Sequence, residues 1–374
     1  MKKISLELQQ CGQYQGGIGT FAYEIAKRIT KYGAFEYYGN YFNFLQRKDA
    51  ASMFRELGFP VRENALMPYG VFRRMWDVCP FYYETFFGEK TDLSVFFNFI
   101  VPPRMHGKAL TFVHDLTYIR YPETMKRSNY RYMSKEVQRS VRESELVLTT
   151  SNFTKKEVRE LLDVPGERIK VVYAAPSLAE EAADYETVKR KYGTGDAYIL
   201  FVSTIEPRKN ISRLIRAFDA VKMRGGFPHK LILAGGSGWS NDEIYETARN
   251  SAYRKDIVFT GYISGEEKNA LYQHASMLVF PSLYEGFGMP PLEAMSWDCP
   301  VVCSNVASLP EIAGDAACFV DPFDEDSIAD GIIRVLKEKE YAKDLAKKGR
   351  EQIRRFSWDA SAEALVNICR EVLC

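Results

Sequence analysis

The sequence lacks the features that mark several classes of protein. No apolar run among its 374 residues approaches the roughly 20 residues that a membrane-spanning helix needs. The seven cysteines show no paired spacing and there are only four histidines, which argues against a disulfide framework or a zinc site. The formal net charge is +1, so the composition does not indicate a nucleic-acid-binding protein. We therefore expect a reduced, cytoplasmic protein without a metal site.

What the chain does contain is a series of short apolar runs that alternate with helical segments. These runs predict strands at residues 4–8, 93–100, 108–113, 146–149, 169–173, 198–203, 230–234, 257–260, 277–280, 301–303 and 317–320. Strands separated by helices predict parallel sheets with helices on both faces. The length suggests two such domains. We place them at residues 1–177 and 178–356, followed by a C-terminal helix at 357–374.

The most informative stretch, Met277 to Met295, reads as a strand, a glycine loop and a helix that starts with two prolines. A helix N-terminus directs free N–H groups at a ligand and favours an anion. Glu285 and Glu293 bracket this loop, and carboxylates suit the paired hydroxyl donors of a sugar or ribose. For Glu293, the favourable electrostatics of an acidic residue in a first helical turn is an equally good explanation.

Two cations, Arg208 and Lys209, stand just before the helix predicted at residues 211–223. A cation at a helix N-terminus is unfavourable without an anion nearby, so this pair points to a diphosphate, although two solvated cations remain an alternative. A second glycine loop, with Gly16 and Gly17, follows the first strand, where a plain turn is the alternative. His114 stands at the end of another predicted strand. It can be interpreted as a group that orients the substrate or as a structural histidine.

Two further stretches carry a surface hypothesis. Residues 34–100 are rich in aromatic side chains, which we expect mainly in the core, with a surface for an acceptor or a membrane interface as the alternative. Residues 124–142 form a basic helix, for which a solvated face is the default and an anionic membrane surface is the alternative.

Together these motifs resemble the retaining glycosyltransferases of the GT-B fold, glycosyltransferase family 4 (group 1), in their mannosyltransferase-like branch. The resemblance rests on Glu-Pro-Arg-Lys-Asn at 206–210, Ala-Gly-Gly at 234–236, Phe-Thr-Gly-Tyr at 259–262 and Pro-Ser-Leu-Tyr-Glu-Gly-Phe-Gly-Met-Pro-Pro-Leu-Glu-Ala-Met at 281–295. Gly-Gly-Ile-Gly at 16–19 and Val-His-Asp at 113–115 extend it to the first half. It implies an α/β protein with two Rossmann-like, doubly wound domains that face a central cleft.

The resemblance also implies roles for single residues. Arg208 and Lys209 match the cations on the donor diphosphate, Glu285 the glutamate near the donor sugar and Glu293 the glutamate on the ribose. His114 matches a residue near the reaction centre. The remaining donor-binding positions are Gly16, Gly17, Ser203, Gly286, Phe287, Gly288 and Met289. Ser203 departs from the family, which more often has glycine in this turn.

The expected activity is hexosyl transfer from a nucleotide sugar, with GDP-mannose as the favoured donor, to a glycan or lipid-linked acceptor in polysaccharide assembly. Arg208 and Lys209 can stabilise the leaving diphosphate, so we expect no metal requirement. Asp324-Glu325-Asp326 is interpreted as a helix N-cap rather than a metal site. The alternatives are a sugar-nucleotide epimerase or phosphorylase, and a non-catalytic protein that binds sugar nucleotides. Peripheral association with the inner face of a membrane is a further expectation.

Overall fold

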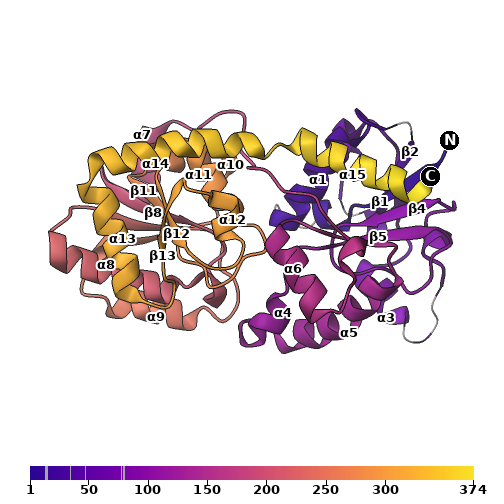
Figure 1. The fold of residues 1–374 in the computed structure, drawn as a ribbon, viewed down its shortest axis with the longest axis horizontal. Helices are drawn as coiled ribbons and strands as arrows, with labels where there is room; N and C mark the ends of the chain where they lie inside the picture. Colours follow the sequence, from indigo (N-terminus) through magenta and orange to yellow (C-terminus); the bar gives the residue numbers. More distant parts are fainter. Residues whose placement is uncertain (13–15, 34, 47, 77, 79–80) are drawn as a thin grey trace. The chain divides into compact units, whose positions relative to one another are not determined.

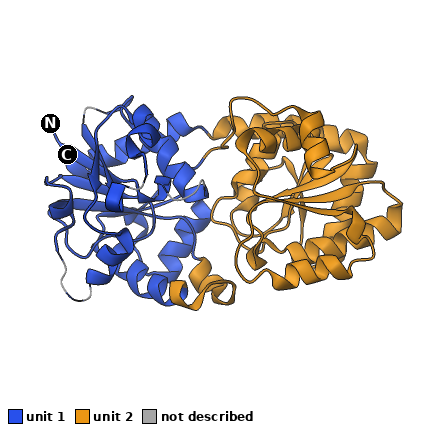
Figure 2. Ribbon diagram, turned by 180° about the vertical axis from the view of Figure 1, so that it is seen from behind, with its two compact units in different colours: residues 1–116, 130–174, 357–374 blue, residues 117–129, 175–356 orange. Residues whose placement is uncertain are grey.

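The computed structural model describes residues 1–12, 16–33, 35–46, 48–76, 78 and 81–374, so that one of the cysteines, Cys79, lies outside the described residues. The chain divides into two compact units (Figure 2). The first comprises residues 1–116, 130–174 and 357–374, and the second comprises residues 117–129 and 175–356. The chain therefore passes between the units four times.

The first unit is built on a parallel sheet of seven strands in the order β3-β2-β1-β4-β5-β6-β7. Its strands are β1 Lys3–Glu7, β2 Glu36–Phe42, β3 Val61–Asn64, β4 Leu93–Phe96, β5 Lys108–Val113, β6 Leu146–Thr149 and β7 Ile169–Val171. Its helices are α1 Gly17–Ile29, α2 Ala50–Met53, α3 Tyr69–Met75, α5 Arg127–Glu143, α6 Asn152–Leu161 and α15 Trp358–Leu373. Helices α1 and α15 cover one face of the sheet, and α3 and α5 the other (Figure 1).

The second unit has a parallel sheet of six strands in the order β10-β9-β8-β11-β12-β13. Its strands are β8 Tyr198–Val202, β9 Lys230–Ala234, β10 Ile257–Gly261, β11 Met277–Phe280, β12 Val301–Ser304 and β13 Ala317–Val320. Its helices are α4 Thr117–Arg120, α7 Tyr185–Tyr192, α8 Ile211–Gly225, α9 Asp242–Asn250, α10 Gly265–His274, α11 Met289–Met295, α12 Leu309–Ala313, α13 Glu325–Lys337 and α14 Lys339–Gln352.

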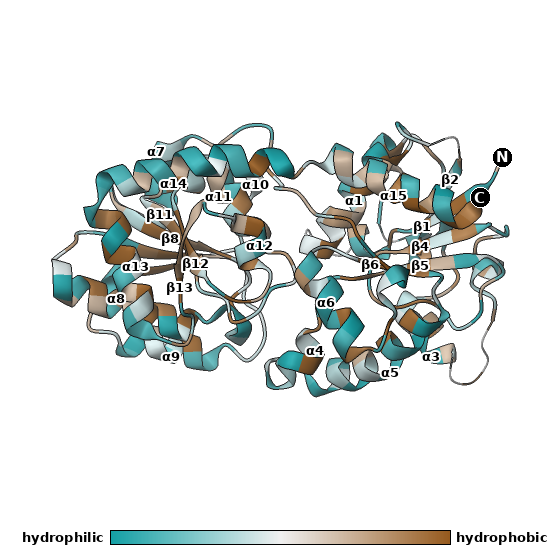
Figure 3. Ribbon diagram, viewed as in Figure 1, coloured by the Kyte–Doolittle hydropathy of each residue, from teal (hydrophilic) through white to brown (hydrophobic). Residues whose placement is uncertain are grey.

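Both sheets have the doubly wound topology predicted from the alternating pattern. The two central strands of the second sheet are apolar throughout, as expected for a sheet with helices on both faces, and every residue of β8 and β11 is buried. In Figure 3 these strands are brown, whereas the outward faces of α13 and α14 are largely teal. The strand order reverses between β1 and β4 in the first unit and between β8 and β11 in the second. Such a reversal opens a crevice at the carboxyl ends of the strands, where ligands bind in this kind of sheet.

The aromatic-rich stretch of the first half is mainly core. Phe42 of β2, Phe72 of α3 and Phe96 of β4 lie in one buried cluster with Tyr83 and Phe87. The rings of Phe42 and Phe72 stack with centroids 4.7 Å apart. The core interpretation is therefore confirmed for these side chains. Other apolar side chains of the stretch are exposed, namely Leu66, Val71, Val78, Phe81 and Tyr82.

Side chains cap the N-termini of α6 and α13. The Ser151 side chain accepts from the backbone N–H of Thr154 at the start of α6. The Asp324 carboxylate accepts from the Asp326 N–H at the start of α13, which confirms the N-cap interpretation. Among the described residues, no group of three or more His, Cys, Asp or Glu side chains is arranged to hold a metal ion. Nor does any helix in that part of the chain have the length and apolarity needed to cross a membrane.

A segment of the first half packs with the second unit, which the sequence does not indicate. Residues 117–129, which we call the strap, comprise α4 and a 3-10 turn at Pro122–Thr124. The Tyr121 hydroxyl donates to the Leu283 carbonyl at 3.3 Å. The indole N–H of Trp239 donates to the Thr124 carbonyl. The strap thus contacts the loops that follow β11 and β9.

The last helix, α15, returns to the first unit and packs against α1. The Trp358 ring meets the Phe21 ring edge to face at a centroid distance of 5.7 Å. The Asp359 carboxylate accepts from Tyr32 at 2.9 Å. At the other end of α15, the Lys108 ammonium donates to the Val372 carbonyl at 2.7 Å. A cation at this end is favourable because the last carbonyls of a helix have no partner within it.

Candidate active site

The predicted donor-site residues gather where the strand order of the second sheet reverses. Strands β8 and β11 are neighbours, and their carboxyl ends lead into loops 203–210 and 281–288. A backbone bond from the Leu283 N–H to the Arg208 carbonyl, 3.0 Å long, joins the two loops. The structure therefore brings Arg208, Lys209 and Glu285 together, although 76 residues separate Lys209 from Glu285.

The centre of this group is a buried ion-pair cluster. Glu285 Oε1 lies 2.6 Å from Lys209 Nζ, and Glu285 Oε2 lies 3.2 Å from Arg208 Nη1. Arg208 Nη2 also contacts Glu206 at 2.8 Å. Two carboxylates and two cations balance in charge, which offsets the cost of removing these groups from water. The Glu285 side chain is only 10% exposed.

The cluster keeps Glu285 ionised. Burial raises its pKa, but the charges of Lys209 and Arg208 more than compensate and lower it to about 2. For Lys209, burial and the neighbouring Arg208 lower the pKa, and Glu285 opposes this shift. At neutral pH Glu285 is a carboxylate that only accepts hydrogen bonds, while the Lys209 ammonium carries three N–H donors, one of which contacts Glu285. The group can therefore present acceptors and donors side by side.

Asn210 fixes the position of the cationic loop. Its φ of 62° is left-handed, a conformation that asparagine tolerates better than most residues. Its side-chain amide donates to the carbonyls of Pro281, at 3.0 Å, and Pro322, at 2.7 Å. One side chain thus ties together the loops that follow β8, β11 and β13.

Two buried serines support the loop that carries Glu285. The Ser304 hydroxyl donates to the Ser282 carbonyl at 2.7 Å. The Ser308 hydroxyl lies 2.9 Å from the carbonyls of both Glu285 and Phe287. Ser304 is the last residue of β12 and Ser308 lies in the segment that follows, and Ser308 holds the backbone on either side of Gly286.

The predicted glycine positions fit close packing. Gly288, at the start of α11, has φ 91°, and a Cβ there would lie 2.6 Å from a methyl carbon of Leu309. Gly286 and Phe287 are buried and Met289 is half-buried. Ser203 is half-buried and its carbonyl lies so close to Gly235 that a Cβ on Gly235 would be 1.9 Å from it. The loop after β9 therefore packs against the loop after β8.

Glu293 lies on α11 and has partners of its own. Its carboxylate lies 2.7 Å from Lys268 Nζ and accepts from the Tyr272 hydroxyl at 3.0 Å. Lys268 and Tyr272 are four residues apart on α10 and so share a face of that helix. Each oxygen of Glu293 has a partner and two further lone-pair positions remain on the group, so a ribose hydroxyl can still donate to it.

In the first unit, His114 follows β5 within a group of aromatic rings. Its Nε2 lies 2.6 Å from the Phe97 carbonyl. Since a carbonyl only accepts, Nε2 carries the proton. Burial lowers the pKa of His114, opposed by the Phe97 carbonyl and Asp115, which favours the neutral ring with a lone pair on Nδ1. The rings of Phe21 and Phe112 lie 5.3 and 5.8 Å from the imidazole.

Gly16 and Gly17 lie at the exposed N-terminus of α1. Gly16 is the N-cap with an extended backbone, and a Cβ there would meet nothing within 4 Å. Both glycines belong to the first unit, like His114. Of the predicted residues, the structure brings Arg208, Lys209 and Glu285 into contact, and the predicted cleft between the two units stays a prediction.

Comparison with known proteins identifies the family. The family model described as glycosyl transferases group 1 matches residues 184–352. The O-antigen chain mannosyltransferase B of Escherichia coli is 35% identical over 274 residues, which cover 72% of each chain. The chain belongs to the group 1 glycosyl transferases.

Two further comparisons agree with the placement of this chain among the group 1 glycosyl transferases. The serotype-specific mannosyltransferase WbdA of Escherichia coli is 29% identical over 269 residues, 69% of this chain and 33% of that protein. Among solved structures, the sucrose-phosphate synthase of Thermosynechococcus elongatus superimposes with a TM-score of 0.74 at 18% identity, over 100% of this chain and 99% of that one. The fold is therefore GT-B, as predicted.

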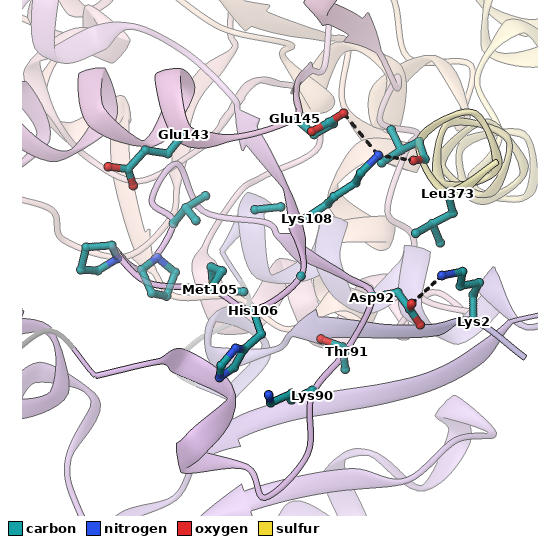
Figure 4. Close-up of a pocket in the computed structure, with 16 residues that line it drawn as sticks. Lys2, Lys90, Thr91, Asp92, Met105, His106, Lys108, Glu143, Glu145 and Leu373 are labelled. Atoms are coloured by element: carbon teal, nitrogen blue, oxygen red, sulfur yellow. Dashed lines mark hydrogen bonds and ion pairs between the residues drawn. The ribbon is translucent and has the colours of Figure 1, made fainter.

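A separate pocket of the glycosyl transferase lies away from these residues. It has a volume of about 680 Å³ and lies at the amino ends of β1, β4 and β5, opposite the edge that leads to His114. In Figure 4, Lys2 points to Asp92, and Lys108 points to Glu145 and to the end of α15. The charges that line it are thus largely paired with one another, and no predicted site residue contributes to it.

Sequence analysis missed several side chains of this site. Glu206 stands in the same motif as Arg208, and their spacing was a usable signal. Lys268 and Tyr272 share a helix face, but nothing in the sequence of their helix indicates that both side chains contact Glu293. Ser304, Ser308 and Asn210 act through loop carbonyls distant in sequence, a relation that a single sequence does not reveal.

Proposed function

We propose that this group 1 glycosyl transferase is a retaining mannosyltransferase that uses GDP-mannose. The acceptor would be a glycan or a lipid-linked sugar in the assembly of a polysaccharide. The relatives support this choice: two of them are described as an O-antigen chain mannosyltransferase and a serotype-specific mannosyltransferase. The observation that carries the proposal is the buried cluster of Glu285 with Arg208 and Lys209 at the reversal of the second sheet.

The cluster suits the charge changes of glycosyl transfer. When the bond between sugar and diphosphate breaks, negative charge develops on the leaving diphosphate and positive charge on the sugar. Arg208 and Lys209 would stabilise the diphosphate, and the ionised Glu285 would lie near the sugar. These cations would make a divalent metal unnecessary. Glu293 would accept a hydrogen bond from the ribose.

Retention follows if the acceptor attacks from the side on which the diphosphate leaves, through an oxocarbenium-like state. His114 would contribute from the first unit. Its neutral ring holds a lone pair on Nδ1, which can accept a hydrogen bond from a sugar hydroxyl. We assign no covalent nucleophile.

A ligand screen tests the donor. We would measure the melting temperature of the protein with GDP-mannose, UDP-glucose, ADP-glucose and dTDP-glucose. A ligand that binds only the folded state raises the free energy of unfolding, by about 2.7 kcal/mol at a hundredfold excess over its Kd. We expect the largest shift with GDP-mannose. No shift with any of the four would remove the donor assignment.

The variant to compare with the wild type in this screen is the double variant Glu285→Gln, Lys209→Met. Replacing both partners leaves less uncompensated buried charge than either single change, so folding is better preserved. We expect this variant to keep its fold by circular dichroism and to lose the donor-induced shift. NMR of the product, compared with the donor, then reports whether the anomeric configuration is retained.

Two other activities are separated by incubation with donor alone. A sugar-nucleotide epimerase would convert the donor without an acceptor, and a phosphorylase would need inorganic phosphate. A protein that only binds sugar nucleotides would show a thermal shift and no turnover. We expect no epimerised donor and transfer only when a mannose-terminated oligosaccharide is present.

Association with the cytoplasmic face of a membrane is part of the proposal. In the first unit, Leu66 and Val78 are 86% and 87% exposed, and the neighbouring Phe81 is 41% exposed. Arg74 and Arg104 are also exposed. Exposed apolar side chains and exposed cations in one unit suit a surface of anionic lipid. Cosedimentation with vesicles that contain an anionic lipid, compared with vesicles of neutral lipid, checks this.

A further inference from the structure

The strap lies against two loops at one edge of the second sheet, and one of them, the loop after β11, carries Glu285. Tyr121 reaches the loop after β11: its hydroxyl donates to the Leu283 carbonyl at 3.3 Å and its ring lies 5.8 Å from the Tyr284 ring. Thr124 reaches the loop after β9, because its carbonyl accepts from the Trp239 indole. The Thr124 hydroxyl donates to the Tyr121 carbonyl at 2.7 Å, which joins the two anchor points in one turn.

From Tyr121, a short chain of hydrogen bonds leads to the ion-pair cluster. Leu283 accepts from Tyr121 through its carbonyl and donates through its N–H to the Arg208 carbonyl at 3.0 Å. Arg208 Nη1 donates to the Tyr284 carbonyl at 2.6 Å and contacts Glu285 at 3.2 Å. Any shift of Leu283 and Tyr284 therefore moves the groups that hold Glu285.

The strap is also joined through the backbone to His114 of the first unit. His114 directly follows β5, and only Asp115 and Leu116 separate it from Thr117, where the strap begins. Each residue contributes at most about 3.6 Å of chain, so the backbone of His114 is tethered within a short distance of the strap. The strap is thus hydrogen-bonded to the loops after β11 and β9, and its first residue is joined to His114 through two residues of backbone.

We propose that the strap is a positioning element for catalysis: through Tyr121 and Thr124 it holds the loops after β11 and β9 in place and links them to His114. This proposal rests on the function proposed above. Tyr121 is a positioning residue, since it acts through the Leu283 and Tyr284 backbone. The sequence region concerned, residues 117–129, has no role in the motifs that identify the family.

The test uses variants that each delete one hydrogen-bond donor. Tyr121→Phe removes the hydroxyl and Trp239→Phe removes the indole N–H, while both keep an aromatic ring. The matched control is Tyr185→Phe, which deletes a hydroxyl donating to the Gly195 carbonyl, also at 3.3 Å, on α7 of the same unit. We would measure kcat and KM with GDP-mannose and a mannose-terminated oligosaccharide, together with the melting temperature.

We expect Tyr121→Phe and Trp239→Phe each to lower kcat about fivefold, as befits the loss of one hydrogen bond in the transition state, with little change in donor KM. Tyr185→Phe should lower the melting temperature as much as they do and leave kcat unchanged. If Tyr121→Phe and Tyr185→Phe have equal kcat, the strap does not position the site.

Hydrogen exchange supplies a readout that does not depend on activity. In the double variant Tyr121→Phe, Trp239→Phe, the amides of residues 282–286 should exchange about tenfold faster, while those of β12 and β13 stay protected. Unchanged exchange in 282–286 would overturn the proposal. If the wild-type protein transfers no sugar from any nucleotide donor, the proposed function fails, and the exchange measurement still decides the strap.

Discussion

At the residue scale, Glu285 and Glu7 show that burial alone does not set the charge of a carboxyl group. Glu285 is buried between two cations, and its pKa is lowered to about 2. Glu7, at the end of β1, is also buried, and burial raises its pKa to about 8, although the Gln9 N–H and the charge of Arg73 oppose this. The difference is a direct ionic contact, which Glu285 has with Lys209.

The first prediction concerns acid. Because the pKa of Glu285 is lower in the folded protein than the ordinary 4.5, its ionised form stabilises the fold above about pH 4.5. This contribution, about 3 kcal/mol, is lost as the pH falls from 4.5 towards 2. Urea unfolding at pH 7 and pH 3 should show a smaller loss in the Glu285→Gln, Lys209→Met variant than in the wild type. Glu340→Gln, at an 87% exposed side chain, should leave the loss unchanged.

The second prediction concerns Glu7, for which stability falls rather than rises as the pH increases. The folded protein holds a proton on Glu7 that the unfolded chain releases above about pH 4.5, so stability falls between pH 4.5 and 8. The loss amounts to at most about 5 kcal/mol, since each unit of pKa corresponds to about 1.4 kcal/mol. Glu7→Gln should be more stable than the wild type at pH 8. Equal unfolding midpoints of the two proteins at pH 8 would contradict this.

At the element scale, the site depends on short loops whose shape is set by a few backbone positions. The loop after β11 runs from a buried strand to α11 within eight residues. It turns at Gly288, and the Ser308 hydroxyl holds the carbonyls of Glu285 and Phe287. The Asn210 amide also donates to the Pro281 carbonyl of the same loop. The glycine is therefore as important for the position of Glu285 as the ion pairs are.

The third prediction compares two glycines. At Gly288, alanine would have to adopt a φ of 91° and would place its Cβ 2.6 Å from Leu309, so Gly288→Ala should destabilise the fold by about 1–3 kcal/mol. At Gly16 the φ is −85° and nothing lies within 4 Å, so Gly16→Ala should leave the unfolding free energy nearly unchanged. Adding Leu309→Ala to Gly288→Ala should relieve the clash but not the backbone strain. Denaturant unfolding of the four proteins checks this order.

Sequence patterns predicted the strands far better than the contacts of the site. Strands β5, β6, β9, β11 and β13 have the predicted bounds, because each is a continuous apolar run between clear breaks. Strand β2, Glu-Tyr-Tyr-Gly-Asn-Tyr-Phe, was missed, since its polar residues and glycine hide the pattern although six of its seven residues are buried. Strand β3 and helix α7 were also missed.

For the site, Arg208, Lys209 and Glu285 meet where the strand order implies, but their pairing was not predictable. The sequence suggested separate tasks for Lys209 and Glu285, whereas the structure pairs them across 76 residues. Such a pair depends on which loops become neighbours at the sheet edge, and that order follows from tertiary structure. The strap escaped notice for the same reason, since its partners Leu283 and Trp239 come from the other half of the chain.

At the scale of the whole molecule, the two units have separate cores. Leu365 of α15 is buried in the first unit and Leu214 of α8 in the second, both without exposed surface. Proteins with several units often unfold in more than one step. Each core should therefore respond to its own substitutions.

The fourth prediction assigns the unfolding steps. Leu365→Ala and Leu214→Ala each leave a cavity and should each cost about 2–5 kcal/mol. In calorimetry, Leu365→Ala should lower the transition of the first unit and Leu214→Ala that of the second. A donor nucleotide sugar should raise mainly the transition that Leu214→Ala lowers, because most of the predicted donor-binding residues belong to the second unit. If both variants lowered one common transition equally, the two cores would not be independent.

The return of α15 to the first unit has a consequence for synthesis on the ribosome. Residues 175–356 emerge as one continuous stretch, whereas the first unit cannot cover α1 until α15 has left the exit tunnel. Domains commonly fold in the order of synthesis. Here the first unit is completed after the second has emerged, and until then the apolar side of α1 is open to chaperones. Removing α15 would therefore expose part of α1, which lies more than 300 positions earlier in the sequence.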